Sequence, residues 1–318
     1  MNVYRGRYAP SPTGEMHLGN AWTALLAWLH ARSHDGRFVL RIEDLDPERS
    51  KPAYEEQVLA DLQWLGLDWE EGTDKGGPFE PYRQSERFPY YQQLLAGFRQ
   101  EGRLYACSCT RAQLSAGAPH PGEQGAAYLG TCREKQLPLD GHYALRIRTP
   151  HKSYGFTDER LGWIEQDVAA AVGDFVVQRA DGVPAYQLAV TADDAAMQIT
   201  HVVRGDDLLD STPRQLFLYE MLGKTPPQFL HLPLLIDPAG RRLSKRQRDL
   251  SLAALRSSGV SAEAIVGYLG WKAGLLPEWR PAAAHELIGR FTVAALPAQP
   301  VVVEALTFLT QALNKKFC

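Results

Sequence analysis

One stretch near the amino terminus decides the fold of this chain, and it reads Arg7-Tyr8-Ala9-Pro10-Ser11-Pro12-Thr13-Gly14-Glu15-Met16-His17-Leu18-Gly19-Asn20. The residues before the prolines have the character of a strand end, the Pro/Gly segment predicts a loop, and His17 stands where an apolar helix begins. A helix N-terminus offers unpaired N–H groups and partial positive charge, and glycine lets a ligand approach the backbone closely. We therefore expect a nucleoside triphosphate to bind here, with His17 donating to phosphate oxygens.

The sequence around this stretch predicts a βαβ unit and therefore an α/β fold. Apolar runs at residues 3–9 and 38–42 are typical of short buried strands, and the apolar density from His17 to Ser33 indicates the helix between them. Other expected elements are helices at 52–65, 86–101 and 207–222, strands at 143–148 and 229–236, a hairpin arm at 175–179 turned by residues 181–182, and a mostly helical end beyond residue 250.

The composition is that of an ordinary soluble protein. Of the 318 residues, 45% are hydrophobic and 22% are charged, which is enough to bury a large core. No run reaches the ~18 apolar residues of a membrane span, and no apolar block of a secretory signal follows the first arginines. We therefore expect a cytoplasmic protein that does not enter a membrane. The formal net charge of −3 argues against a general polyanion binder but is compatible with a local basic surface for RNA.

The cysteine pattern indicates metal binding. Cys107, Cys109 and Cys132 lie within one short segment, whereas Cys318 is the last residue, and four cysteines do not make a disulfide framework in a chain of this length. Zinc usually takes Cys or His ligands, so His120 and His142 have the chemistry to complete the site. Buried free thiols are the alternative. A Gly/Pro/Ala-rich loop at 115–130 in the same region favours an inserted subdomain.

A basic segment follows the last predicted strand and the Asp-Pro-Ala-Gly turn at residues 237–240, and it reads Arg241-Arg242-Leu243-Ser244-Lys245-Arg246. A lysine in such a loop acts as a point charge, so Lys245 is suited to contact the β- or γ-phosphates of ATP while pyrophosphate departs. A solvated basic loop is the alternative interpretation. The position directly after a strand and a turn favours phosphate chemistry.

Together these segments resemble the paired signatures of class I aminoacyl-tRNA synthetases. His17-Leu18-Gly19-Asn20 stands in place of H-I-G-H, and Arg242-Leu243-Ser244-Lys245-Arg246 stands in place of K-M-S-K-S. The Pro-Ser-Pro-Thr-Gly lead-in and Arg41-Ile42-Glu43-Asp44-Leu45-Asp46 narrow the resemblance to the glutamyl branch, over about residues 3–250. The chain is most similar to the short form of that branch, which acts on queuosine in tRNA(Asp), because 318 residues leave no room for a long anticodon-binding domain. The resemblance implies a Rossmann-like nucleotide-binding fold.

The resemblance also implies the roles of individual residues. The catalytic residues would be His17 and Lys245. The ATP site, with Mg²⁺ accompanying the nucleotide, would comprise His17, Gly19, Asn20, Arg242, Leu243, Ser244, Lys245 and Arg246. The glutamate pocket, in which Glu43 receives the α-ammonium, would comprise Arg7, Ala9, Ser11, Glu43, Tyr186 and Arg204. One structural zinc ion would be held by Cys107, Cys109, Tyr128 and Cys132, with Tyr128 implied by the family pattern Tyr-x-x-x-Cys and His120 as its alternative.

The expected function is ATP-dependent activation of L-glutamate and its transfer to the queuosine base in the anticodon loop of tRNA(Asp), by a monomer. We expect residues 1–102 and 184–240 to form the catalytic domain, 103–183 the inserted zinc-binding subdomain, and 241–318 the signature loop and a helical end, without a separate anticodon-binding domain. Conventional charging of a tRNA 3′ end is the alternative among enzymes. A non-catalytic, synthetase-derived RNA-binding module is the alternative from another class, which the intact His17, Lys245, Arg7 and Glu43 disfavour.

Overall fold

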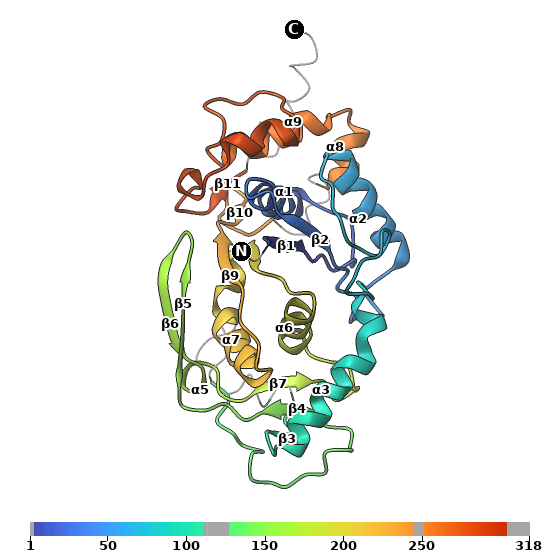
Figure 1. Cartoon of the computed structure of the whole chain (residues 1–318), viewed down its shortest axis with the longest axis vertical. Coiled ribbons are helices and arrows are strands. Elements are labelled where there is room, and N and C mark those ends of the chain that lie inside the picture. The colour runs from blue at the N-terminus through green and yellow to red at the C-terminus, as the bar shows by residue number, and fades with distance from the viewer. Residues whose placement is uncertain (1–2, 111–112, 114–126, 244–250, 304–318) are drawn as a thin grey trace.

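The computed structural model describes residues 3–110, 113, 127–243 and 251–303. Figure 1 shows an elongated molecule, with helices α8 (Leu252–Ser257) and α9 (Ala262–Lys272) at one end and strands β3 (Leu104–Cys107), β4 (Ala144–Ile147) and β7 (Phe175–Gln178) at the other. Strands β1 (Arg5–Tyr8) and β2 (Arg37–Leu40) lie between these ends. Within the described ranges, every helix is too short or too polar to cross a bilayer.

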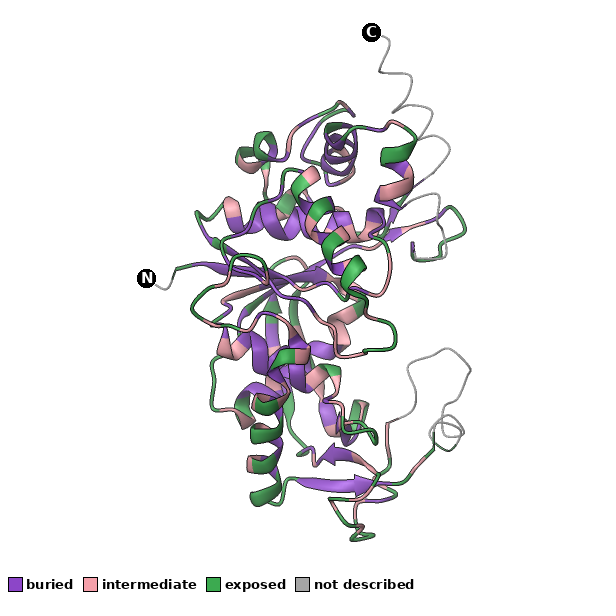
Figure 2. Cartoon of the chain, turned by 90° about the vertical axis from the view of Figure 1, so that its right-hand side faces the viewer, coloured by how far each residue is buried: buried purple, intermediate pink, exposed green. Residues whose placement is uncertain are grey.

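The predicted βαβ unit is present. Strands β1 and β2 are parallel, with Arg7 opposite Val39, and helix α1 (Leu18–Arg32) connects them. Helix α1 is buried on nearly every side, because the C-terminal helices pack against it from the face opposite the strands (Figure 2). On its other edge β1 lies beside β8 (His201–Gly205), where the Thr200 N–H donates to the Arg5 carbonyl over 3.0 Å.

A second sheet continues the nucleotide-binding half in the order β6-β5-β9-β8. Strands β8 and β9 (Gln228–Leu232) are parallel and are connected by the 3-10 turn η2 (Asp206–Ser211) and helix α7 (Thr212–Met221). Strands β5 (Ser153–Asp158) and β6 (Gly162–Asp167) form an antiparallel hairpin on the outer edge. Helix α6 (Tyr186–Ala196) precedes β8 and packs against α7. The carboxyl ends of β1, β2, β8 and β9 therefore lie on one side, where α/β folds bind their ligands.

The opposite end of the molecule has its own small core. Strands β3, β4 and β7 form an antiparallel sheet whose apolar side chains pack with helix α3 (Phe88–Gln100) and with α7. The short helix α5 (Val168–Ala171) leads into β7, and the 3-10 turn η1 (Gln84–Arg87) leads into α3. Helix α2 (Pro52–Trp64) belongs to the main core instead, through Val58 and Leu62.

The carboxyl-terminal part covers α1. Helices α8 and α9 and the 3-10 turns η4 (Ala284–Arg290) and η5 (Val293–Ala295) share the core of the βαβ unit. Strand β11 (Val301–Val302) pairs in parallel with β10 (Leu235–Ile236), which connects this part back to the sheet.

Three local predictions differ from the structure. Residues 229–236 form two strands, β9 and β10, because Pro233 has no N–H with which to continue the ladder. The α-helix predicted from residue 207 begins at Thr212, since Pro213 fits only the first turn of an α-helix. Of the arm predicted at 175–179, residues 175–178 form β7 and pair with β4, and after the turn a single bridge joins Gln178 to Pro184 before helix α6 begins.

The β5–β6 hairpin has no counterpart among the predicted strands. Its signal was present, since Tyr154, Phe156 and Asp158 alternate with more exposed residues in the period of two that marks a half-buried strand. The hairpin falls inside the predicted insert of 103–183, yet Asp158 pairs with Phe229 of β9. The predicted domain boundaries stay a prediction.

Candidate active site and metal centre

A cavity of about 420 Å³ opens at the carboxyl ends of the parallel strands. The loop after β1, the N-terminus of α1, the residue Glu43 after β2, the start of α6, the end of β8 and the segment after β9 all contribute to its wall. Every residue of the predicted ATP and glutamate sites that the structure describes lines this one cavity: Arg7, Ala9, Ser11, His17, Gly19, Asn20, Glu43, Tyr186, Arg204, Arg242 and Leu243. Ser244, Lys245 and Arg246 lie outside the described residues.

His17 is the N-cap of α1. Its Nδ1 accepts a hydrogen bond from the Gly19 N–H over 3.0 Å, so the neutral ring carries its proton on Nε2. The Asn20 side chain completes a capping box by accepting from the His17 N–H over 3.1 Å. A Cβ atom at position 19 would lie 2.9 Å from the His17 ring, so glycine is needed there for space. Asn20 replaces the second signature histidine, and its side-chain oxygen has a structural role as the acceptor for the His17 N–H.

Arg7 is held by a buried ionic network. Its Nε donates to Asp194 Oδ1 over 3.2 Å, and Arg41 Nη1 donates to the same oxygen over 2.7 Å. Arg41 Nη2 also donates to Glu43 Oε1 over 3.1 Å. Burial raises the pKa of Glu43 in spite of the opposing charges of Arg41 and Arg7. For Asp194 the two arginines outweigh the effect of burial and lower the pKa.

Arg204 differs from Arg7 in its partners. Its Nε donates to His231 Nε2 over 3.1 Å, Nη1 donates to Gln215 over 2.9 Å, and Nη2 donates to Thr212 over 2.7 Å. Within the described part of the chain, no carboxylate forms an ion pair with Arg204, and only 4% of the residue is exposed. Burial and the neighbouring charge of Arg7 lower the pKa of Arg204, and the guanidinium remains charged. Arg204 is thus a buried cation at a cavity wall, suited to an anionic ligand.

The first residues of the basic loop reach the cavity mouth. Leu243 is buried, and its N–H donates to the Leu235 carbonyl over 3.1 Å. Arg242 is largely exposed and forms an ion pair with Asp207, another residue of the cavity wall. Asp237 caps the preceding turn by accepting from the Ala239 and Arg241 N–H groups. The residues directly after this turn, Arg242 and Leu243, line the cavity.

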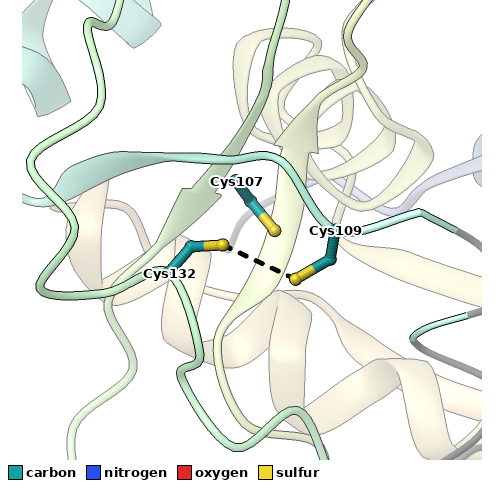
Figure 3. Close-up of side chains that lie close together, drawn as sticks. All are labelled: Cys107, Cys109 and Cys132. Carbon is teal, nitrogen blue, oxygen red and sulfur yellow. Dashed lines mark hydrogen bonds between the residues drawn. The ribbon is translucent and has the colours of Figure 1, made fainter.

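The three clustered cysteines converge, as Figure 3 shows, with all of their sulfur atoms within 4.8 Å of one another. Cys107 ends β3, Cys109 follows it, and Cys132 comes from the loop before β4. Burial opposes the thiolate of Cys132, but hydrogen bonds from the Ser108 backbone and the Tyr128 hydroxyl outweigh it and lower the pKa to about 6. His142 does not join this group, and His120 lies outside the residues that the structure describes.

The Tyr128 hydroxyl is directed at the same point. It lies 3.5 Å from Cys107 Sγ and 3.7 Å from Cys109 Sγ, while Cys109 Sγ and Cys132 Sγ are 3.5 Å apart. A tetrahedral ion with Zn–S of ~2.3 Å and Zn–O of ~2.0 Å would place sulfurs about 3.8 Å apart and the oxygen about 3.5 Å from each sulfur. The donor set and its spacing therefore fit a tetrahedral metal ion.

Two contacts position Tyr128. The Arg146 guanidinium lies 3.7 Å from the centre of its ring, and the Tyr128 N–H donates to the Val172 carbonyl over 2.8 Å. The neighbouring Gly173 has a φ of 72°, and a Cβ atom there would lie 2.2 Å from the Tyr128 carbonyl oxygen. Glycine at this position permits the close backbone approach that brings Tyr128 to the cysteines.

Several residues at the cavity were not predicted from the sequence. Asp194 and Arg41 form the ionic frame behind Arg7 and Glu43, and His231 with Asp158 stands behind Arg204. A signal for Asp194 exists in the pair of adjacent acids, Asp193 and Asp194, inside an otherwise apolar helix, because buried carboxylates require partners. His231 carries no comparable signal, since one histidine in an apolar strand is usually structural.

Comparison with known proteins identifies the family. A model of the family described as tRNA synthetases class I (E and Q), catalytic domain, matches residues 3–309. Two curated relatives, from Nitratidesulfovibrio vulgaris at 49% identity and from Symbiobacterium thermophilum at 52% identity, are each named glutamyl-Q tRNA(Asp) synthetase, and each alignment covers 95% of this chain and 96% of the relative. A glutamate–tRNA ligase from Sulfurihydrogenibium sp. is 42% identical over 90% of this chain and 60% of its own length.

A solved structure supports the same placement. The glutamate tRNA ligase of Elizabethkingia meningosepticum superimposes with a TM-score of 0.83 at 29% identity, covering 99% of this chain and 70% of that one. The fold and the cavity thus define a class I aminoacyl-tRNA synthetase, a ligase with an α/β nucleotide-binding fold. Within that class, the chain belongs to the family of class I tRNA synthetases for glutamate and glutamine, and the resemblance predicted from its signatures is confirmed.

Proposed function

We propose that this chain activates L-glutamate with ATP to form glutamyl-adenylate and then transfers the glutamyl group to the queuosine base in the anticodon loop of tRNA(Asp). The observation that carries the activation step is the placement of Arg204, a buried arginine without a carboxylate partner in the described structure, in one cavity with Glu43 and the N-terminus of α1. Two carboxylates and an ammonium are the charges of glutamate, and the cavity offers groups of opposite sign for them.

The reaction needs positioning more than covalent help. The α-carboxylate of glutamate attacks the α-phosphorus of ATP in line, so a new P–O bond forms while the bond from the α-phosphorus to the bridging oxygen breaks and pyrophosphate leaves. Mg²⁺ bound with the nucleotide would offset the charge of the phosphates. His17 and the N-terminus of α1 would hold phosphate oxygens, and Lys245 would neutralise the departing pyrophosphate. Arg204 and Arg7 would face substrate carboxylates, and Glu43 would accept the α-ammonium. Ala9, Ser11 and Tyr186 would form the rest of the glutamate pocket.

In the second step a hydroxyl of the acceptor attacks the acyl carbon of the adenylate, an ester bond forms, and AMP leaves. The choice of queuosine as acceptor is supported by the names of the two relatives that align along nearly their whole length. The longer glutamate–tRNA ligases support conventional charging of a 3′ end as the competing outcome. We place the reaction in the cytoplasm, where ATP and tRNA are present, and we propose that the enzyme acts as a monomer.

We also propose that one zinc ion is bound by Cys107, Cys109, Cys132 and Tyr128. The support is the tetrahedral fit of three sulfurs and one phenol oxygen. The ion would supply a structural crosslink between β3 and the loop before β4, distant from the cavity. Its removal is expected to affect folding of that end more than the chemistry of activation.

Glutamate-dependent ATP–pyrophosphate exchange tests the activation step directly. A panel containing glutamate, glutamine and aspartate, assayed with and without tRNA, should give far stronger exchange with glutamate than with the other two, and without a requirement for tRNA. Equal exchange with glutamine would contradict the proposed substrate. A protein that binds tRNA but supports no exchange with any amino acid would instead indicate a non-catalytic module.

A further inference from the structure

A buried histidine stands behind Arg204, and we propose that His231, held by Asp158, positions the Arg204 guanidinium for the side-chain carboxylate of the amino-acid substrate. The inference deepens the proposed function and rests on it, because it takes glutamate to be the ligand of Arg204. His231 does not line the cavity, so its role would be that of a positioning residue.

Asp158 fixes which nitrogen of His231 carries the proton. One carboxylate oxygen, Oδ2, accepts from His231 Nδ1 over 2.8 Å and from the His231 backbone N–H over 3.0 Å. The other, Oδ1, accepts from the backbone N–H groups of Arg160 over 3.1 Å and Leu161 over 2.9 Å. An ionised carboxylate is only an acceptor, so Nδ1 must carry the proton of the imidazole. The four hydrogen bonds fix both the ring and its tautomer.

The opposite nitrogen then faces Arg204 as an acceptor. Nε2 of His231 lies 3.1 Å from Arg204 Nε, which always carries a hydrogen, so the lone pair of the neutral ring receives it. The charged groups around the ring are Asp158 from β5, Arg204 from β8 and Asp206 from η2, and Arg160 donates through its Nε to the His231 carbonyl oxygen over 2.6 Å. Burial, together with the charge of Arg204, lowers the pKa of His231 in spite of Asp158. An imidazolium would direct a second N–H at Arg204.

The hydrogen bonds of Arg204 leave room for one carboxylate. Three of its five N–H groups donate to His231, Gln215 and Thr212. The other two N–H groups have no acceptor among the residues that the structure describes, and a carboxylate accepts two from an arginine in bidentate geometry. Because β9 and α7 hold the three protein acceptors, the guanidinium plane is fixed before a ligand arrives. Preorganisation of this kind lowers the entropic cost of binding.

A purely structural role for His231 makes a different prediction. The ring is fully buried and stacks on Phe229, with centroids 6.1 Å apart and planes 15° apart. His231→Phe keeps an aromatic ring in this place but removes the acceptor for Arg204 Nε. His231→Gln keeps an acceptor oxygen close to the Nε2 position. His231→Asn places its amide near the Nδ1 position, away from Arg204.

The experiment measures glutamate-dependent ATP–pyrophosphate exchange by the full chain and its variants, together with their melting temperatures. We expect His231→Phe to raise the KM for glutamate by at least about tenfold, the effect of an unmet hydrogen bond of a charged group, with little change in the KM for ATP. His231→Gln should recover most of the affinity that His231→Phe loses. His201→Phe is the matched control, because it makes the same change on the neighbouring strand β8 outside the cavity.

Each result decides the inference. An unchanged KM for glutamate in His231→Phe would overturn it. It would also be overturned if His231→Phe and His231→Gln lost equal affinity for glutamate and these losses only followed their lower melting temperatures. If His231→Phe does not fold, a higher KM in His231→Asn than in His231→Gln supports the positioning role, and equal values reject it. Absence of glutamate-dependent exchange in the unaltered protein would overturn the proposed function and this inference with it, whereas normal exchange with unaffected variants overturns the inference alone.

Discussion

At the scale of single residues, the buried arginines in and behind the cavity wall fall into two kinds according to their hydrogen-bond and ion-pair partners. Arg7 and Arg41 share the carboxylate of Asp194, and Arg41 also pairs with Glu43 and Asp193, so both arginines have carboxylate partners before any ligand binds. Arg204 donates to neutral acceptors, and no carboxylate of the described chain pairs with it. A buried cation without a counter-ion is costly for folding, and such groups cluster where a ligand supplies the missing charge.

Substitution of Arg204 should therefore reduce selectivity as well as activity. We expect Arg204→Gln to lower kcat/KM for glutamate by at least about thirtyfold, corresponding to the 2–5 kcal/mol, roughly, of a truncated buried charge pair. Activation of glutamine should fall much less, because an amide loses no ion pair. Parallel exchange assays with the two amino acids measure this, with Arg179→Gln on the exposed turn after β7 as the control. Equal losses for both amino acids would show that Arg204 does not read the side-chain carboxylate.

His201 should make stability depend on pH. Its ring stacks on Tyr4 at 4.0 Å, and burial, followed by the proximity of His30, lowers the pKa of His201 to about 4 from an ordinary value near 6.5. Between these values the unfolded chain binds a proton that the folded chain does not, so this contribution is complete above pH 6.5 and is lost as the pH falls toward 4. The slope cannot exceed about 1.4 kcal/mol per pH unit for one proton, and partial exposure of the ring reduces it.

Urea unfolding at pH 7.5, 6.0 and 5.0 tests this expectation. The unaltered protein should lose more stability across this interval than His201→Phe, which keeps the stacking on Tyr4 but cannot titrate. Parallel curves for the two proteins would show that other groups cause the pH dependence.

At the scale of elements, the N-terminus of α1 contributes both to the stability of the fold and to the wall of the cavity. The capping box of His17 and Asn20 satisfies N–H groups of the first turn, and the same turn forms part of the cavity wall. This element could be predicted from the sequence, because the Pro/Gly loop and the apolar helix are local signals. The role of Asn20 in the capping box could not be predicted, because its partner is the His17 backbone N–H, and the direction of that N–H depends on the folded turn.

Loss of that cap should cost stability. We expect Asn20→Ala to lower the free energy of unfolding by about 1 kcal/mol, because the His17 N–H loses its acceptor. Asn20→Asp keeps an acceptor oxygen and should retain most of this stability, while its negative charge should raise the KM for ATP. Urea unfolding and exchange kinetics on both variants separate the two effects. Unchanged stability in Asn20→Ala would mean that water replaces the cap.

The metal centre belongs to the same scale, because it joins β3 to the loop before β4. We expect about one zinc ion per chain by elemental analysis, and chelation should lower the melting temperature of the unaltered protein. Cys109→Ser and Tyr128→Phe should both bind zinc more weakly, whereas Cys318→Ser, which removes a cysteine far from the cluster in sequence, should not. Full zinc in Tyr128→Phe with its loss in His120→Ala would require a different fourth ligand.

At the scale of the whole molecule, the sequence predicts the nucleotide-binding half better than the arrangement around it. The two signature segments are local and lie in the order that the family requires, so the cavity residues could be named in advance. The pairing of β5 with β9 brings Asp158 to His231, which is 73 residues further along the chain, and no local pattern records such a contact. Residues that line the cavity were therefore predictable, whereas the residues behind the wall that hydrogen-bond to them were not.

At the scale of the whole molecule, the remaining question is which nucleotide of the tRNA receives the glutamyl group. If the cavity is complete without a tRNA, as the groups around Arg204 and α1 indicate, glutamate activation should proceed without one, and the nucleic acid should enter only at transfer. We expect labelled glutamate to appear on queuosine of tRNA(Asp), because a hydroxyl of its cyclic diol needs only to come within about 3–3.5 Å of the acyl carbon. Transfer should weaken with salt if basic side chains near Arg242 contact the phosphates.

The measurement is nuclease digestion of the charged tRNA followed by mass analysis of the labelled nucleoside, with tRNA(Asp) lacking queuosine as the matched control. Label on the terminal adenosine, or equal labelling of the control tRNA, would assign the chain to conventional 3′-end charging.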